Sequence, residues 1–249
     1  MTVVVQLSDP HIGADWGVRD PAEALARAVA EARALEPDAT IVTGDVAEHA
    51  ADAEYELARE ILAGAGAPVH VLPGNHDDRA ALRRHFGLPG AGAERVTYAA
   101  ESGGLRMLIL DSTIPGEDAG ELGAEQLAWL DGELSASAAP ALVALHHPPI
   151  ATGIPAADAL ALDAEDGAAL RALAARHAHV LRIAAGHVHR TIAGEQSVFV
   201  APSAYVQLRL ELRAEETDVT AEPAGFAVHV LTGGGLASHV VPVTADRTR

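Results

Sequence analysis

The sequence predicts an α/β fold in which two packed β-sheets are flanked by helices. Strand-type and helix-type segments alternate through the first two thirds of the chain, and only strand-type segments follow Gly194. Short runs of histidine, aspartate and asparagine also follow several apolar strand-type segments, which places polar side chains at strand ends. Because the sequence contains neither an internal repeat nor a linker, we expect residues 1–249 to form one domain.

The first predicted helix has the clearest boundary signal. Asp20 suits the N-cap, Pro21 the first helical position and Glu23 the first turn, so we expect a helix from 20 to about 35. Glycines at 64 and 66 end a second helix, expected from about 52 to 63. The other elements of this half are a short helix at 77–85 and strands at 3–7, 40–43 and 69–72.

The second half begins with a pair of predicted strands at 96–99 and 106–110. The acidic, glycine-flanked segment 116–120 is expected to be a flexible loop. The remaining predicted elements are helices at 125–134 and 168–176 and strands at 141–145, 180–184, 198–200, 205–212, 226–231 and 238–243. Gly233, Gly234 and Gly235 are expected to form the turn before the last strand.

Composition narrows the classes of protein that this chain can represent. It contains no cysteine, which excludes disulfides and thiolate metal ligands and fits a cytoplasmic protein. A strand-type segment directly follows Met1, and no apolar run is long enough to span a membrane. The formal net charge of −18 argues against binding a nucleic-acid backbone. It would also repel a phosphate ester, unless two divalent cations made the site locally positive.

Five runs of potential metal ligands follow predicted strands in a fixed order. They are Asp9-Pro10-His11, Gly44-Asp45, Gly74-Asn75-His76-Asp77, His146-His147-Pro148 and Gly186-His187-Val188-His189. Several of these runs, taken alone, also fit a turn or a helix N-cap. Imidazole nitrogens with carboxylate and amide oxygens are ligands that borderline divalent metals prefer. Together the runs predict a hydrolytic centre that holds two metal ions.

Spacing adds more specific expectations. In an extended backbone, side chains two residues apart project to the same side, so Asp9 and His11 could chelate one ion, and His187 and His189 would lie on one side of their segment. Adjacent His146 and His147 would point to opposite sides, so only one of them is expected to be a ligand. Asp45 would bridge the two ions.

The run around His76 predicts the catalytic group. Asn75 would bind metal through its amide oxygen, His76 would face the substrate, and Asp77 would orient His76 by accepting its other ring N–H. Whether His49, His85 or Arg190 contacts the substrate is left open. Five other histidines are expected to be structural or solvent-facing: His70, His177, His179, His229 and His239. Three arginines are expected to coat a solvated helix face and not to bind phosphate: Arg79, Arg83 and Arg84.

The ordered motifs D-x-H, G-D, G-N-H-D, H-H-P-P and G-H-x-H resemble those of the calcineurin-like metallophosphoesterases. The resemblance is greatest to the bacterial class III cyclic-nucleotide phosphodiesterase branch, which also includes glycerophosphodiester hydrolases. It extends over nearly the whole chain, through 123–130, 201–207 and 223–226. Two other branches fit less well. Residues 46–49 lack the Asp-Arg-Gly of protein serine/threonine phosphatases, and His76 stands where lipid A precursor pyrophosphatases carry arginine.

The family implies a two-sheet α/β/β/α sandwich with two metal ions at the strand ends. The residues that match its ligands are Asp9, His11 and His189 for one ion, Asn75, His146 and His187 for the other, and Asp45 as the bridge. The family's ligand in the His-His-Pro motif is the first histidine, which makes His147 a neighbour. Its metals are variously iron, manganese, zinc or cobalt.

The resemblance implies hydrolysis of a phosphodiester, with a 3′,5′-cyclic nucleotide such as cAMP as the favoured substrate. Metal-bound hydroxide would attack the phosphorus, while His76, held by Asp77, would protonate the departing alkoxide. The alternatives are a glycerophosphodiester hydrolase, a broad-specificity phosphomonoesterase and a non-catalytic scaffold of the same fold. We expect a small phosphodiester as the ligand and neither nucleic acid nor membrane as a partner, and a homodimer is compatible with the sequence.

Overall fold

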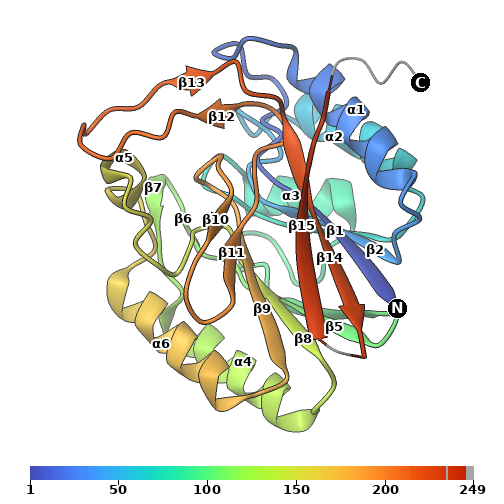
Figure 1. Cartoon of the computed structure of the whole chain (residues 1–249), viewed down its shortest axis with the longest axis vertical. Coiled ribbons are helices and arrows are strands. Elements are labelled where there is room, and N and C mark those ends of the chain that lie inside the picture. The colour runs from blue at the N-terminus through green and yellow to red at the C-terminus, as the bar shows by residue number, and fades with distance from the viewer. Residues whose placement is uncertain (234, 245–249) are drawn as a thin grey trace.

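The computed structural model describes residues 1–233 and 235–244, and it forms four layers in the order helices, sheet, sheet, helices. In Figure 1 the helices α1 and α2 lie on one side of the molecule and α4 and α6 on the other, with the strands between them. This arrangement confirms the α/β/β/α sandwich that the sequence predicted.

The first sheet has the strand order β15-β14-β1-β2-β3. Its parallel part comprises β1 (Thr2–Leu7), β2 (Ala39–Thr43) and β3 (Val69–Leu72). The antiparallel strands β14 (Gly225–Thr232) and β15 (Gly235–Pro242) extend it along the outer edge of β1. The carboxyl ends of three consecutive parallel strands therefore meet at one edge of this sheet.

Three helices cover the outer face of the first sheet: α1 (Pro21–Arg33), α2 (Asp52–Leu62) and α3 (Arg79–Phe86). Helix α1 begins as predicted, because the Asp20 side chain accepts a hydrogen bond from the Glu23 N–H at 2.8 Å. A short 3-10 turn, Ala63–Ala65, follows α2 and ends at Gly66, whose φ is +77°.

The second sheet has the order β10-β11-β9-β8-β5-β4. Its strands are β4 (Tyr98–Ser102), β5 (Leu105–Ile109), β8 (Ala141–Ala144), β9 (Val180–Ala185), β10 (Ile192–Ala193) and β11 (Val198–Val200). Helices α4 (Gly123–Ala136) and α6 (Ala164–Arg176) pack on its outer face, and α5 (Pro155–Asp158) is a single turn. Strands β5, β8 and β9 are mutually parallel, so a second set of carboxyl ends faces the first.

The alternation of side chains along β1 shows how the layers are held together. Val3, Val5 and Leu7 pack against the helices α1 to α3, whereas Val4 packs between the two sheets. Across the interface, Met107 of β5 and Leu142 of β8 belong to the same apolar cluster as Val4. Burial of this apolar surface on both faces of each sheet is the main driving force for the fold.

The loop at 116–120 and the strand at 205–212 differ most from their sequence predictions. The expected loop 116–120 contains strand β7 (Glu117–Gly120), which pairs with β6 (Thr113–Ile114). The expected strand 205–212 is reduced to β12 (Gln207–Leu208), which pairs with β13 (Val219–Thr220). Apolar residues beyond β12 favoured a longer strand, but Leu210 and Leu212 are exposed at 54 % and 57 % and find no buried face.

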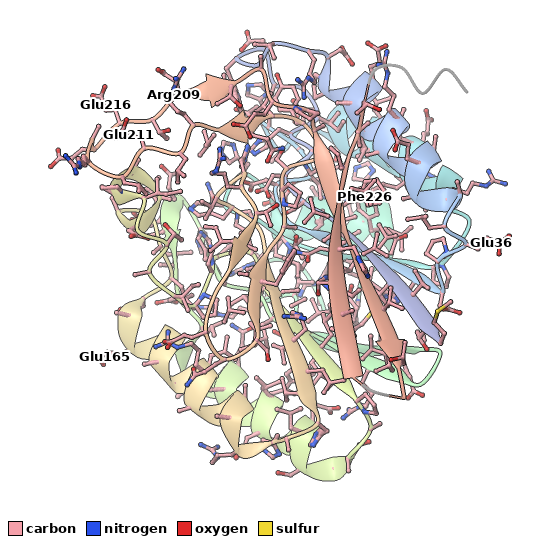
Figure 2. All side chains as sticks on the ribbon, in the orientation of Figure 1. Glu36, Glu165, Arg209, Glu211, Glu216 and Phe226 are labelled. Atoms are coloured by element: carbon pink, nitrogen blue, oxygen red, sulfur yellow. The ribbon has the colours of Figure 1, made fainter. Side chains whose placement is uncertain are left out.

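The β12–β13 segment projects from the body of the molecule. Figure 2 shows Arg209, Glu211 and Glu216 at its margin, with their side chains directed away from the core. The turn expected at Gly233–Gly235 includes Gly234, which lies outside the described residues. Within the described part of the chain, no helix combines the length and apolar character needed to cross a membrane.

Candidate metal centre

All five polar runs lie at the carboxyl ends of parallel strands, as predicted. They follow β1, β2 and β3 in the first sheet and β8 and β9 in the second. Backbone hydrogen bonds tie neighbouring runs together, including Asp9 N–H to the Gly44 carbonyl at 3.1 Å and Gly186 N–H to the His146 carbonyl at 2.9 Å. Across the sheets, His187 N–H donates to Asp9 Oδ1 at 3.0 Å, so the two sheets bring their strand ends to one place.

The backbone at these strand ends is left-handed and not extended. Positive φ values occur at Asp9 (50°), His11 (45°), Asp45 (51°), His187 (70°) and His189 (49°). Such values are uncommon for residues other than glycine and cluster at functional sites. The expectation of an extended backbone at these runs is therefore wrong, but Asp9 and His11 still share one ligand group. His187 lies against His146, whereas His189 lies against His11.

One group of potential ligands comprises Asp9, His11 and His189. The Nε2 atoms of His11 and His189 are 3.1 Å apart, and Asp9 Oδ1 is 3.7 Å from His189 Nε2. All three residues are buried. Their ligand atoms lie within 4.8 Å of one another, which is the spread that a single ion can span.

A second group comprises Asn75, His146 and His187. His146 Nε2 lies 3.1 Å from Asn75 Oδ1 and 3.2 Å from His187 Nδ1. Asp45 stands between the two groups, because its Oδ2 is 3.5 Å from His11 Nε2 and 3.3 Å from His146 Nε2. The seven residues selected from the sequence thus lie together, in the two groups that the family resemblance implied.

The outer ring nitrogen of three of these histidines has an acceptor that fixes its proton. Nδ1–H of His11 donates to Glu48 Oε2 at 2.7 Å, that of His146 to the Thr43 carbonyl at 2.8 Å, and that of His189 to the Val206 carbonyl at 3.1 Å. In the neutral tautomer, each Nε2 therefore presents a lone pair toward carboxylate oxygens and other nitrogens. Such a cluster of lone pairs is stable around cations, and the donor set fits metal binding.

Burial and charge act strongly on the two carboxylates. Burial raises the pKa of Asp9 to about 6. Burial opposes ionisation of Asp45 too, but His146 and His11 outweigh it and hold the pKa of Asp45 well below its ordinary value. Burial and the neighbouring histidines lower the pKa values of His187 and His189, which favours the neutral, metal-binding form.

A chain of hydrogen bonds runs from Asp9 into the space between the sheets. Ser8 donates to Asp9 Oδ2 at 2.5 Å, Thr43 Oγ1 donates to Ser8 at 2.7 Å, and Gln6 Nε2 donates to Thr43 Oγ1 at 3.0 Å. At its far end His229 Nε2 donates to Gln6 Oε1 at 3.0 Å. Every donor points toward Asp9, so the chain fixes the carboxylate without requiring a charge. His229 is structural, as expected.

His76 lies beside the first group and is partly accessible. Its ring centroid is 4.9 Å from that of His11, and its side chain is 34 % exposed. His76 Nδ1–H donates to the Glu48 carbonyl at 3.1 Å. The backbone N–H of His76 donates to Asp45 Oδ1 at 3.0 Å, which positions the loop relative to the bridging carboxylate.

The expectation that Asp77 orients the His76 ring is wrong. The Asp77 carboxylate accepts hydrogen bonds from the backbone N–H groups of Gly74, Val46 and Ala47, at 2.9, 3.1 and 3.1 Å. It therefore ties the loop after β3 to the loop after β2. Helix α3 begins later than predicted, after Asp78, whose side chain accepts from Ala81 N–H at 2.7 Å.

Close packing explains the glycine of the same run. A Cβ at Gly74 would lie 2.1 Å from Asp45 Oδ1 and 2.3 Å from the Asp45 nitrogen. Only glycine lets the third strand end approach the carboxylate between the two ligand groups.

Sequence reasoning missed Glu48 and Trp16. Glu48 Oε2 accepts from His11, and Oε1 accepts from Trp16 Nε1–H at 2.9 Å. A carboxylate behind a ligand histidine fixes its tautomer and raises its basicity. The spacing from Asp45 to Glu48 carries no motif that would have identified it. The contact depends on the left-handed turn at His11.

His147 is buried beside the second group, 4.6 Å from His187 between ring centroids. Its Nδ1 accepts from the Ser112 hydroxyl at 2.9 Å, and its Nε2–H donates to the Asp118 carbonyl at 3.0 Å. Burial and His146 lower the pKa of His147 to about 3. Both ring nitrogens are thus engaged in anchoring the β6–β7 hairpin.

The residues left open at the pocket rim have protein partners. Nδ1 of His49 lies 2.8 Å from Glu54 Oε1, and Nε2 of His85 lies 2.8 Å from Asp52 Oδ1. Arg190 donates to the Leu208 carbonyl at 2.5 Å.

Two of the three arginines expected on a solvated helix face are instead structural. Arg83 is buried, and its guanidinium donates to the carbonyls of Pro89, Gly92, Glu94 and Arg95. Arg79 forms an ion pair with buried Asp111 at 2.8 Å. Only Arg84 matches the expectation, with a side chain that is 60 % exposed.

Comparison with known proteins identifies the family of this site. The family model for calcineurin-like phosphoesterases matches residues 2–191, which include every residue of the two ligand groups. The chain belongs to the calcineurin-like phosphoesterase family. Family membership makes it a hydrolase of phosphate esters and implies a site for two metal ions.

Relatives and structures agree with this assignment. A probable glycerophosphodiester phosphodiesterase of Arcobacter nitrofigilis is 32 % identical over 95 % of this chain and 92 % of that protein. A cAMP/cGMP dual specificity phosphodiesterase of Mycobacterium tuberculosis is 35 % identical over 75 % of this chain and 61 % of that protein. The crystal structure of a Danio rerio dimetal phosphatase shares the fold, with a TM-score of 0.69, 15 % identity and coverage of 98 % and 99 %.

Proposed function

We propose that this phosphoesterase hydrolyses phosphodiesters and that its favoured substrate is a 3′,5′-cyclic nucleotide such as cAMP. The observation that carries the proposal is the pair of ligand groups on either side of Asp45, with His76 beside them. Two cations that shared one carboxylate would suit a phosphate group that bears negative charge.

In this proposal Asp9, His11 and His189 hold one ion, Asn75, His146 and His187 hold the other, and Asp45 contacts both. Two bound ions would supply Lewis-acid chemistry, which provides a nucleophile from water near neutral pH and neutralises charge on the phosphate. Iron, manganese, zinc and cobalt all suit this set of nitrogen and oxygen donors.

His76 is the proposed proton donor to the leaving alkoxide. Its Nδ1–H is committed to the Glu48 carbonyl, so the ring is fixed and Nε2 is the nitrogen that can exchange a proton with substrate. In the imidazolium form Nε2–H would protonate the ribose oxygen as the phosphorus–oxygen bond breaks. The hydrogen bond from its backbone to Asp45 keeps this ring beside the proposed metal site.

Glycerophosphodiester hydrolysis is the second candidate. The relative from Arcobacter nitrofigilis matches this chain over nearly the full length of both proteins, and its name describes that activity. The two substrates share the diester that the metal site would bind, and differ in the group carried by the alcohol. Residues that distinguish the two substrates would lie next to the metal site, where they would contact the alcohol group.

A substrate panel tests the proposal. Metal-loaded protein would be assayed with 3′,5′-cAMP, 2′,3′-cAMP, glycerophosphocholine and p-nitrophenyl phosphate esters. We expect the highest kcat/KM for 3′,5′-cAMP. Higher kcat/KM for glycerophosphocholine would favour the second candidate, and hydrolysis of monoesters alone would contradict both.

We also propose that residues 1–249 act as one domain in the cytoplasm, with a homodimer as the assembly to test.

A further inference from the structure

Trp16 is a partly exposed aromatic side chain directly beside the first ligand group. Its ring centroid lies 5.2 Å from that of His11 and 6.0 Å from that of His189. Trp16 is 40 % exposed. Aromatic side chains are scarce in this protein, because tyrosine, phenylalanine and tryptophan make up only 3 % of the chain. An indole that served only to fill the core would be expected to be buried, as the adjacent Tyr205 is.

Several contacts hold Trp16 in place. Its Nε1–H donates to Glu48, the same carboxylate that accepts from His11, so the indole is tied to a proposed metal ligand. Its ring packs edge-on against Tyr205, with centroids 5.2 Å apart. At the next residue, a Cβ on Gly17 would lie 2.2 Å from the Tyr205 hydroxyl, so glycine lets the loop lie directly on that ring. The indole is therefore preorganised before any ligand binds.

The charges around this loop define what the exposed indole surface can bind. Three carboxylates, Asp15, Asp20 and Glu48, act electrostatically on the adjacent Tyr205. A second anionic group on the substrate would be repelled there, whereas a neutral aromatic ring would stack on the indole without a charge penalty. Purine rings are of this kind and glycerol is not aromatic, whereas choline is a quaternary ammonium ion that an indole beside carboxylates would bind by a cation–π contact.

We infer that Trp16 is a stacking surface for the nucleobase of the substrate, and that it favours nucleotide diesters over glycerophosphodiesters that carry no cationic group. The inference rests on the proposed phosphodiesterase function and specifies its substrate class. With the phosphate at the metal site, the base lies one ribose away, within reach of an indole next to His11. Stacking on an aromatic side chain is tolerant of base identity, so the site would accept more than one nucleobase.

The first test compares two substrates in one variant. Trp16→Ala should raise KM for 3′,5′-cAMP about tenfold and leave KM for glycerophosphoglycerol, whose second alcohol carries neither a ring nor a cation, within about twofold. Both substrates need the metal site, so indirect damage through Glu48 would affect both equally. Trp16→Phe keeps a ring but loses the hydrogen bond to Glu48, and it should retain most of the preference for cAMP. Val18→Ala changes an exposed side chain of the same loop and should leave both KM values unchanged.

The second test needs no turnover. The chain has two tryptophans, so Trp129→Phe leaves Trp16 as the only indole emitter. Adenosine 5′-monophosphate should quench the emission of the metal-loaded protein at saturation, whereas sn-glycerol 3-phosphate should bind with little quenching. Equal quenching by the two phosphates, or none by the nucleotide, would overturn the inference.

The two tests separate this inference from the proposed function. If the wild-type protein fails to hydrolyse cAMP but the nucleotide still quenches Trp16 selectively, the proposed reaction is wrong and the stacking surface stands. If cAMP is hydrolysed and Trp16→Ala changes both KM values equally or neither, the reaction stands and the stacking surface is wrong.

Discussion

In His11, His146 and His189, a hydrogen bond from Nδ1–H fixes the tautomer and so leaves Nε2 free to face the proposed metal. For His146 and His189 the acceptor is a backbone carbonyl, which no substitution can remove. For His11 it is the Glu48 carboxylate, which can be changed. A substitution of the side chain behind His11 can therefore change the metal affinity of the first ligand group.

Glu48→Ala should weaken binding at the first metal site by about ten- to a hundredfold, because His11 loses the partner that fixes its tautomer. Glu48→Gln keeps an acceptor but loses the charge, so its effect should be smaller. Calorimetric titration of metal-free protein measures both affinities. Glu56→Ala, an exposed glutamate on α2, is the matched control, and an effect as large as that of Glu48→Ala would contradict this role.

His76→Ala should preserve metal content and lower kcat for 3′,5′-cAMP by about a hundredfold to ten-thousandfold. The loss should be far smaller for bis(p-nitrophenyl) phosphate, because p-nitrophenolate departs without a proton whereas a ribose alkoxide does not. Parallel kinetics on the two substrates decide the matter. Equal losses at full metal occupancy would exclude the role of general acid and leave His76 as a positioning group.

At the scale of elements, the strand ends were the most predictable part of this molecule. Apolar runs followed by histidine and aspartate placed all seven proposed ligands at the carboxyl ends of β1, β2, β3, β8 and β9. The directions of their side chains were not predictable in the same way. Spacing assumes an extended backbone, and five of these residues are left-handed because loop hydrogen bonds from neighbouring strand ends hold them so.

The same limit explains the errors at Asp77 and Arg83. Asp77 was expected to accept a hydrogen bond from the His76 ring, and Arg83 to lie on a solvated helix face, where charged side chains are usually exposed. In the structure Asp77 accepts hydrogen bonds from three backbone N–H groups, two of them in the loop after β2. Arg83 donates to four backbone carbonyls of the irregular segment after α3. Local sequence carries no signal for a partner that only the folded loop presents.

Arg83→Leu should lower the free energy of unfolding by about 3 kcal/mol, because the carbonyls of the loop after α3 would lose a buried charged donor. Arg84→Leu, at the adjacent exposed position, should change it by less than about 0.5 kcal/mol. Urea denaturation of the two variants provides the comparison. Similar values for both would show that the Arg83 hydrogen bonds contribute little.

At the scale of the whole molecule, His229, at the far end of the polar chain between the sheets, should make the stability of the fold depend on pH. Burial and Arg182 lower the pKa of His229 to about 3, whereas an unfolded histidine titrates near 6.5. Above pH 6.5 His229 is neutral in both states. Below it the unfolded state takes up a proton that the folded state does not, so stability falls as pH falls from about 6.5 toward 3.

His229→Gln should remove this one-proton dependence while keeping donors and acceptors for Gln6 and Ser238. Between pH 6.5 and pH 5 the unfolding free energy of the wild type should fall by about 2 kcal/mol more than that of the variant. Denaturation curves at the two pH values, in the same metal-containing buffer, give the difference. An identical fall in both proteins would show that His229 is not the group responsible.

The overall charge of −18 places a general constraint on the same molecule. An acidic protein that binds phosphate esters needs a local source of positive charge, and the lone pairs that converge around Asp45 supply positions for two cations. The layered fold provides those positions, because strand ends of both sheets meet at Asp45.

The metal content of Asp45→Ala tests the account most directly. Because Asp45 is the proposed shared ligand, its loss should remove both ions, whereas His11→Ala or His146→Ala should mainly weaken one site, and His147→Ala should keep most of the metal. Elemental analysis of the purified variants gives metal per chain, with circular dichroism to show that each is folded. Loss of both ions from folded Asp45→Ala is the predicted result, and retention of two ions per chain would contradict the shared centre.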